Sequence, residues 1–201
     1  ANQIVSSNSL ALAATITALG GEPLQLGIAP DNRESLRSMV VGASRADLLI
    51  TTGGISVGEH DLVRSVLQEA GLELDFWQIA MRPGKPLMFG KIGATPVIGL
   101  PGNPVSTLVC AIIFIKPALQ TLLGIKPNTS PPVKARLTGS LLQNDHRQDY
   151  LRAQLSYDGK GEAVVTPFRQ QDSSMLACLA QANCLILRPP RALALKPGSK
   201  V

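Results

Sequence analysis

Short apolar runs alternate with longer segments of helical periodicity over residues 1–125. The short runs predict strands, and the longer segments, several of which end on a glycine, predict helices. We expect strands at 23–29, 47–52, 74–80, 86–90 and 95–100, with the last two as a hairpin, and helices at 8–20, 33–44, 62–71 and 104–123. Asp31 and Glu34 have the spacing of a capping box at the second helix. The pattern predicts an open, mostly parallel α/β sheet with helices on both faces.

The pattern changes after Leu123. Residues 124–132, "GIKPNTSPP", have the composition of a linker. Beyond them, short alternating segments bounded by Gly, Pro and Asp predict a small all-β, barrel-like domain with one helix near 174–183. We therefore expect two domains, at 1–125 and 126–201. The chain opens without a methionine, so we expect it to be a fragment of a longer protein.

Composition excludes several classes of protein. Hydrophobic residues make up 45% of the chain and charged residues 16%, which indicates a well-packed core rather than disorder. The net charge of +5 suits an anionic ligand, but no basic run interleaved with aromatics suggests nucleic acid. The longest apolar run, Val109–Ile115, is too short to span a bilayer, and no signal peptide is visible. We interpret Cys110, Cys178 and Cys184 as small hydrophobic residues in a reducing compartment, the cytoplasm.

Four loops are expected at one edge of the predicted sheet. They are "APDN" (29–32), "TTGGISVGEHD" (51–61), "MRPGKP" (81–86) and "LPGNPVS" (100–106). Ligands of open α/β sheets bind beyond the carboxyl ends of the strands. The convergence of these loops predicts a ligand site there.

The loop at 51–61 has two interpretations. Its backbone amides can hold an anion at a helix N-terminus, or its glycines can simply allow a tight strand-to-helix turn. It lacks the Gly-Lys-Ser/Thr of a phosphate loop. Glu59 and Asp61 cap the next helix in one interpretation and hold a magnesium ion or a polar ligand in the other.

The other polar residues also have two interpretations each. Arg82 and Lys85 flank a rigid turn that is either a solvated basic turn or an oxyanion site. Ser106, in the first turn of a helix, satisfies local backbone groups or binds an anion. His60 and His146 lack a nucleophile in a recognisable elbow, which argues against a hydrolytic triad.

The ordered motifs "GGISVGEHD", "MRPGKP" and "GLPGNPVS" resemble those of the MoeA-type molybdopterin molybdenumtransferases, a family that includes the gephyrin E domain. "RQDYLRAQL" and "QQDSSMLACLAQANCLILRP" extend the resemblance through the β domain. It implies molybdenum cofactor biosynthesis, in which molybdate is inserted into adenylylated molybdopterin and AMP is released. Family members are elongated homodimers with four domains per subunit, and this chain resembles the last two, without the first strand of the molybdopterin-binding domain.

The resemblance also implies roles for individual residues. Asp31 and Asp61 match catalytic acidic positions, and Glu59 with Asp61 would hold Mg²⁺. Gln78, after Trp77, stands where some relatives carry a lysine, so no charge role is carried over to it. Substrate-binding positions are Gly53, Gly54, Ser56, Arg82, Lys85, Pro86, Asn103 and Ser106; the molybdate pocket would comprise Lys85, Ser106, Arg152 and Ser173.

Two alternatives remain open from the sequence. One is a non-catalytic scaffold or peptide-binding module of the gephyrin E type, which would need an exposed apolar groove. The other is a related α/β enzyme, such as the molybdopterin adenylyltransferase or the competence-damage-inducible family, both of which lack the β tail at 133–201. The adenylyltransferase is also a candidate partner, and we expect the isolated chain to bind an oxyanion without turnover.

Overall fold

The structure, a computed structural model, describes residues 7–54, 62–126, 131–172 and 175–201. The chain divides into two compact units. The first comprises Ala1–Ile79 and Gly84–Pro127, and the second comprises Ala80–Pro83 and Asn128–Val201. The four-residue segment Ala80–Pro83 therefore belongs with the C-terminal part of the chain, although no feature of the sequence separates it from its neighbours.

The first unit contains a four-stranded sheet in the order β1-β5-β4-β2. The strands are β1 (Leu49–Thr52), β2 (Leu72–Gln78), β4 (Pro86–Ile92) and β5 (Thr95–Leu100). Only the β1–β5 pair is parallel among these described strands, whereas β4 is antiparallel to both β2 and β5. The prediction of a mostly parallel sheet is therefore wrong. The β4–β5 hairpin, which was predicted, reverses the chain inside the sheet.

The predicted strand at 23–29 is also absent from the described structure. Leu24 and Ile28 are 67% and 73% exposed, and Gly27 has a φ of 89°. Apolar residues alone do not make a strand, because a strand also needs a neighbour for its backbone hydrogen bonds.

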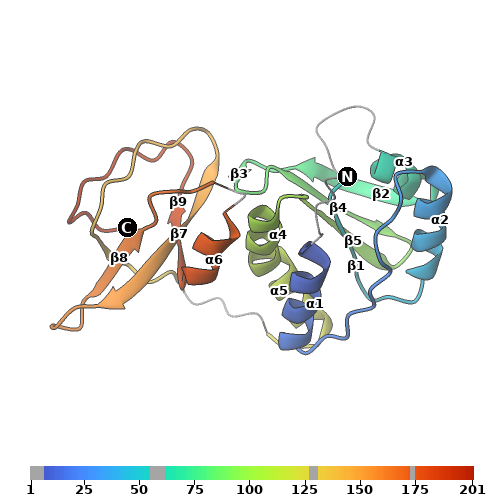
Figure 1. Ribbon diagram of the computed structural model, residues 1–201, viewed down its shortest axis with the longest axis horizontal. Helices are drawn as coiled ribbons and strands as arrows, with labels where there is room; N and C mark the ends of the chain where they lie inside the picture. The colour runs from blue at the N-terminus through green and yellow to red at the C-terminus, as the bar shows by residue number, and fades with distance from the viewer. Residues whose placement is uncertain (1–6, 55–61, 127–130, 173–174) are drawn as a thin grey trace. The chain divides into compact units, whose positions relative to one another are not determined.

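Helices lie on both faces of this sheet, as predicted (Figure 1). On one face are α2 (Arg33–Gly42) and α3 (Leu62–Glu69), and Leu67 of α3 packs with Met88 and Val97 of the sheet. On the other are α1 (Asn8–Ala18), α4 (Pro104–Cys110) and α5 (Lys116–Leu122). This two-sided cover explains why β5 is a nearly continuous apolar run.

The cap of α2 differs from the prediction. Asn32, not Asp31, is the N-cap, and its side chain accepts a hydrogen bond of 2.9 Å from the backbone N–H of Ser35. Asp31 lies one residue too early for its side chain to reach the free N–H groups of the first turn.

The helix after Pro104 continues to Leu122 through a π-helical segment, η1 (Ala111–Ile115). Pro117 lies two residues after the end of this segment, and a proline removes one helical hydrogen bond and crowds the preceding turn, which a wider π turn relieves. By length and composition this helix could cross a membrane, a property it shares with core helices of globular proteins. Val105, Val109 and Ile115 are fully buried.

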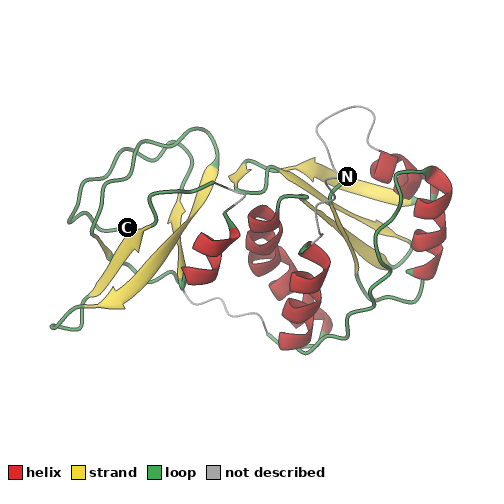
Figure 2. Ribbon diagram, in the orientation of Figure 1, coloured by secondary structure: helices red, strands yellow, loops and turns green. Residues whose placement is uncertain are grey.

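The second unit is built mainly of strands and loops (Figure 2). Its sheet contains β3 (Met81–Arg82), β6 (Arg136–Leu137), β7 (Gln148–Tyr157), β8 (Ala163–Pro167) and β9 (Cys184–Arg188). Along one path the order is β3-β7-β8-β6, and β9 pairs with β7. The helix predicted near 174–183 is α6 (Leu176–Gln181). Within the described residues the strands form an open sheet that does not close into a barrel.

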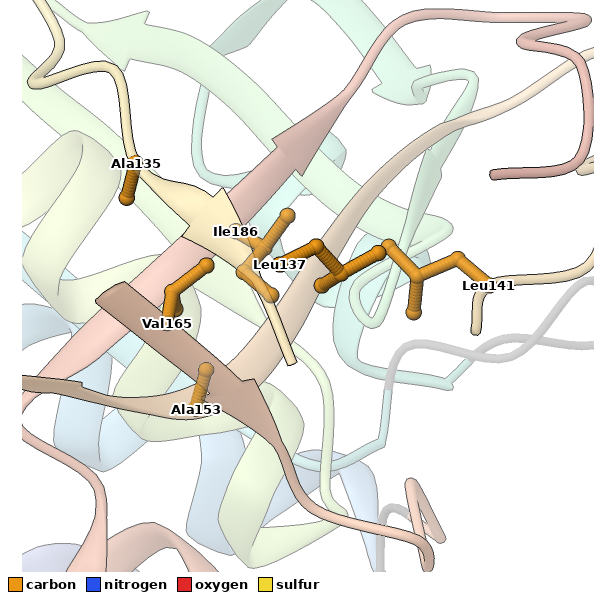
Figure 3. Packing of buried hydrophobic residues seen from close by; sticks show 6 residues of the cluster. All are labelled: Ala135, Leu137, Leu141, Ala153, Val165 and Ile186. Atoms are coloured by element: carbon orange, nitrogen blue, oxygen red, sulfur yellow. The ribbon is translucent and has the colours of Figure 1, made fainter. Parts of the chain in front are cut away.

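One apolar cluster holds this unit together (Figure 3). Its members come from β6, β7, β8 and β9, from the residue directly before β6 and from the loop after it. They are Ala135, Leu137, Leu141, Ala153, Val165 and Ile186. The core is made of aliphatic side chains, as the scarcity of aromatic residues predicts.

Candidate functional site

Three strands of the first unit end at the same edge of the sheet. β1 and β5 are parallel, and Thr52 lies opposite Leu100 at their ends. β2 runs in the same direction as β5, since both are antiparallel to β4, and it ends there at Gln78. The loops that begin "TTGG", "MRPGKP" and "LPGN" therefore start at one edge, as the sequence predicts. "APDN" follows no strand, so the argument that placed Asp31 at this edge does not hold.

The first and third of these loops are in direct contact. A Cβ added to Gly102 would lie 3.2 Å from the Cα of Gly53, and the φ of Gly53 is 75°. The Asn8 amide joins the two loops by donating to Thr52 Oγ1 at 2.9 Å and to the Gly102 carbonyl at 2.8 Å. The glycines thus allow close packing of the loops. Asn8 was missed by the sequence analysis, because nothing in its local sequence distinguishes it from an ordinary helix-cap residue.

The turn into α4 is held by a residue that the sequence analysis did not select. Thr107 Oγ1 lies 2.6 Å from the Pro101 carbonyl and 3.0 Å from the Asn103 carbonyl. Ser106, which was selected, is buried in the first turn of α4. The Oδ1 atom of Asn103 is buried and has no hydrogen-bond partner among the described residues. This turn therefore has one satisfied hydroxyl, on Thr107, and one free buried acceptor, on Asn103.

The two cations of "MRPGKP" have different surroundings. Arg82, in β3, donates from Nε and Nη2 to Asp149 Oδ1 and Oδ2 at 3.0 and 2.6 Å. The side chain of Asp149 is only 5% exposed, and Arg82 Nη1 lies 3.6 Å from Asp145. Lys85 is exposed and has no ion-pair partner in the described part of the chain. The structure thus neutralises Arg82 within the second unit and leaves Lys85 available.

Arg152 is the most unusual polar residue of the second unit. It lies in the middle of β7 and is 2% exposed. Its Nε and Nη1 atoms are buried and have no hydrogen-bond partner among the described residues. Buried N–H groups are almost always paired, and a buried charge without a partner is costly. This guanidinium therefore has two hydrogen-bond donors without an acceptor in the described structure.

The surroundings of Arg152 have opposing effects on the pKa of its guanidinium. Burial lowers its pKa, while Cys178 and Asp172 act in the opposite direction. Its backbone is held by Gln171, whose side-chain oxygen accepts from the Arg152 N–H at 3.0 Å and whose Nε2 donates to the Arg152 carbonyl at 2.9 Å. Gln171 and Asp172 were quoted in the family motif, but they were not selected as site residues.

The remaining selected residues have more ordinary positions. Gly54 has a φ of 69°, and a Cβ there would lie 2.4 Å from Val63 Cγ2, so this position requires glycine. Pro86 begins β4 opposite Gln78. Asp31 is exposed. The selected residues that lie outside the described residues are Ser56, Glu59, Asp61 and Ser173.

Both predicted magnesium ligands, Glu59 and Asp61, lie outside the described residues. Within the described ranges, no three His, Cys, Asp or Glu side chains are grouped so that they could hold a metal ion. The magnesium site therefore stays a prediction about Glu59 and Asp61.

Comparison with known proteins agrees with this arrangement. The family model described as "probable molybdopterin binding domain" matches residues 1–121, and that described as "MoeA C-terminal region (domain IV)" matches residues 134–201. A molybdopterin molybdenumtransferase of Haemophilus influenzae is 36% identical over 92% of this chain and 46% of its own length. Gephyrin of Dictyostelium discoideum is 35% identical over 88% of this chain and 28% of its own.

A solved structure gives the same result. The molybdopterin biosynthesis moea protein from Pyrococcus horikosii matches 99% of this chain and 47% of its own, with a TM-score of 0.81 and 31% identity. The chain thus spans about half the length, or less, of these relatives. By sequence and by fold, the chain belongs to the MoeA-type molybdopterin molybdenumtransferase family.

Proposed function

We propose that this chain provides the oxyanion-binding part of an enzyme that inserts molybdate into adenylylated molybdopterin and releases AMP. The observation that carries the proposal is the buried Arg152 guanidinium with two unpartnered nitrogen atoms. Molybdate is a tetrahedral dianion, and guanidinium N–H groups form short, strong hydrogen bonds to such oxyanions. A bound oxyanion would satisfy the donors that the fold leaves free.

Other residues are proposed to complete the site. Lys85 and Ser106 would add an ammonium group and a hydroxyl, and Ser173 a second hydroxyl, to the molybdate pocket. The loop glycines Gly53 and Gly54 and the amide of Asn103 would contact adenylylated molybdopterin, together with Ser56 and Pro86. Asp31 and Asp61 are proposed as the catalytic acidic residues.

Arg82 has a different part in this proposal. Because both oxygen atoms of Asp149 already accept hydrogen bonds from it, Arg82 would hold the turn in place and Lys85 would meet the anion. The proposal therefore retains Arg82 near the substrate as a positioning residue.

Turnover is proposed to need more than this chain. Reacting groups misplaced by about 1 Å can lose roughly 100-fold in rate. The relatives carry about as much sequence again, and we propose that this additional sequence and a homodimer complete the active site. The isolated chain is then expected to bind molybdate without releasing AMP.

The test titrates sodium molybdate into the purified chain by isothermal calorimetry, with Arg152→Met as the matched variant. AMP release from adenylylated molybdopterin is followed in parallel, with the full-length Haemophilus influenzae relative as the positive control. Binding that is lost in Arg152→Met is the expected result. Equal molybdate binding by both chains would reject Arg152 as the anion-binding residue, and AMP release at the control rate would reject the need for further sequence.

A non-catalytic scaffold role is the alternative. A scaffold that binds a peptide through apolar contacts has no need for a buried, unpartnered cation. Unchanged molybdenum cofactor synthesis in cells whose parent protein carries Arg152→Met would favour it.

A further inference from the structure

One residue of the second unit contacts the backbone of Arg152 with every polar atom of its side chain. Besides its two hydrogen bonds with the Arg152 backbone, Gln171 Nε2 lies 2.9 Å from the Phe168 carbonyl. The Phe168 N–H in turn donates to the Arg152 carbonyl at 3.1 Å. Arg152 is therefore held on one side by a closed set of hydrogen bonds.

The sheet explains why a side chain is needed there. Along one edge of β7, β3 pairs with Gln148 and Asp149, and β8 pairs with Ala153 to Tyr157. Between these two partners, no strand lies opposite the backbone of Arg152. The Gln171 amide offers an acceptor and an N–H donor to Arg152, as a backbone residue does, and it fills this gap in the ladder; its second N–H is directed to Phe168.

From these contacts we infer that Gln171 is a positioning residue, which fixes the backbone of Arg152 so that its guanidinium is held in place for an oxyanion. The inference rests on the proposed function, since it assigns the anion to Arg152. A group that binds a ligand must have its own position fixed by neighbouring hydrogen bonds, and here the neighbour acts on the main chain.

The same strand provides a matched control. Asn183 makes an equivalent pair of hydrogen bonds to Leu155: its Oδ1 accepts from the Leu155 N–H at 2.7 Å, and its Nδ2 donates to the Leu155 carbonyl at 2.9 Å. This clamp lies on the β9 side of β7, directly before β9 begins. It fixes an apolar residue three positions after Arg152.

The experiment compares Gln171→Met with Asn183→Leu in the purified chain. Both changes keep the approximate size of the side chain and remove its amide. We expect Gln171→Met to weaken molybdate binding about tenfold, which corresponds to the loss of about one hydrogen bond between the anion and an Arg152 guanidinium whose backbone is no longer fixed. Asn183→Leu should change it less than twofold, although urea unfolding should show a similar loss of stability in both variants.

A second readout is independent of molybdate. The Nε–H resonance of Arg152, assigned through its absence in Arg152→Met, should shift or broaden in Gln171→Met and stay unchanged in Asn183→Leu. An unaltered resonance in Gln171→Met would overturn the inference, as would equal losses of molybdate affinity in the two variants. If the unsubstituted chain binds no molybdate, the proposed function fails, and the resonance still decides whether Gln171 positions Arg152.

Discussion

The regions around Arg152 and Arg188 differ in one decisive respect. Both arginines are 2% exposed, lie in neighbouring strands of one sheet and have a pKa lowered by burial. Arg188 Nη2 lies 2.6 Å from the Leu193 carbonyl, with the carbonyls of Ala192 and Leu142 at 3.3 and 3.4 Å. Arg152 has two nitrogen atoms for which the described structure offers no acceptor.

This difference separates a structural arginine from one that we propose binds an anion. Arg188 lies opposite Asp149, which in turn lies opposite Arg82, so three adjacent strands carry a row of alternating charge. The fold supplies that row with its own counter-charges and acceptors. Burial of an arginine therefore does not by itself point to a site, whereas buried donors left free call for a ligand, an ion or a water molecule.

The largest effect is expected for Arg188→Met. The change removes a cation facing the buried Asp149 and leaves the acceptor carbonyls unpaired, so the free energy of unfolding of the second unit should fall by about 4 kcal/mol. Molybdate affinity of the fraction that remains folded should stay within twofold. Urea unfolding measures the free energy of unfolding, and calorimetry measures the molybdate affinity. If Arg188→Met is as stable as the unsubstituted chain, Arg188 is not a structural residue and the contrast with Arg152 is lost.

Arg152→Met should give the opposite result. Molybdate affinity should fall roughly 100-fold, equal to about 2.7 kcal/mol, because charge-assisted hydrogen bonds are lost. Stability should change little, since the cost of burying the guanidinium is removed together with its attraction to Asp172. The same two measurements apply, and a large loss of stability would show that Arg152 is structural after all.

Arg82→Ala is expected to destabilise the second unit by about 2 kcal/mol, because it leaves the buried Asp149 carboxylate without its bidentate partner. The effect is smaller than for a fully buried pair, because part of the Arg82 side chain is exposed to water. Adding Asp149→Asn should recover part of this loss. No recovery in the double variant would show that Arg82 and Asp149 contribute to stability independently of each other.

Lys85→Ala should leave stability unchanged and weaken molybdate binding about threefold at low salt, with a smaller effect at high salt. The side chain is exposed, and exposed charges are screened within about 10 Å at 0.1 M ionic strength. Titrations at 20 and 500 mM sodium chloride measure this difference. Equal effects at both concentrations would argue against an electrostatic role.

The smallest expected effect is on the pH dependence of unfolding at low pH. Hydrogen bonds from Arg147 and its charge, with a contribution from Arg82, hold the pKa of Asp145 below its usual value. A lowered pKa stabilises the fold above the unfolded value, near pH 4, and that contribution is lost as the pH falls further. Asp145→Asn and Arg147→Met should each make unfolding less dependent on pH below about 4. An unaltered slope in both variants would contradict the assignment.

Some sequence predictions depended on partners that the pattern does not reveal. Residues 23–29 are apolar enough for a strand but pair with no neighbour in the described structure. The sequence predicted that Arg82 belongs to a solvated basic turn or an oxyanion site. Its partner Asp149 lies 67 residues further along the chain. Arg152 and Gln171 were both visible in the family motif, but only their contacts distinguish the proposed anion-binding group from the group proposed to position it.

Apart from the strand expected at residues 23–29, which is absent from the described structure, the sequence by itself determined the order of helices and strands in the first unit, the β4–β5 hairpin, the edge at which three glycine-rich or proline-rich loops begin, and the family. These follow from local periodicity and turn residues, which act between neighbours in the chain. Only the tertiary structure decided that Arg82 is neutralised, that Arg188 is satisfied and that Arg152 keeps free donors. Each of these depends on which residues face each other across strands, and strand register is fixed by packing of the whole sheet.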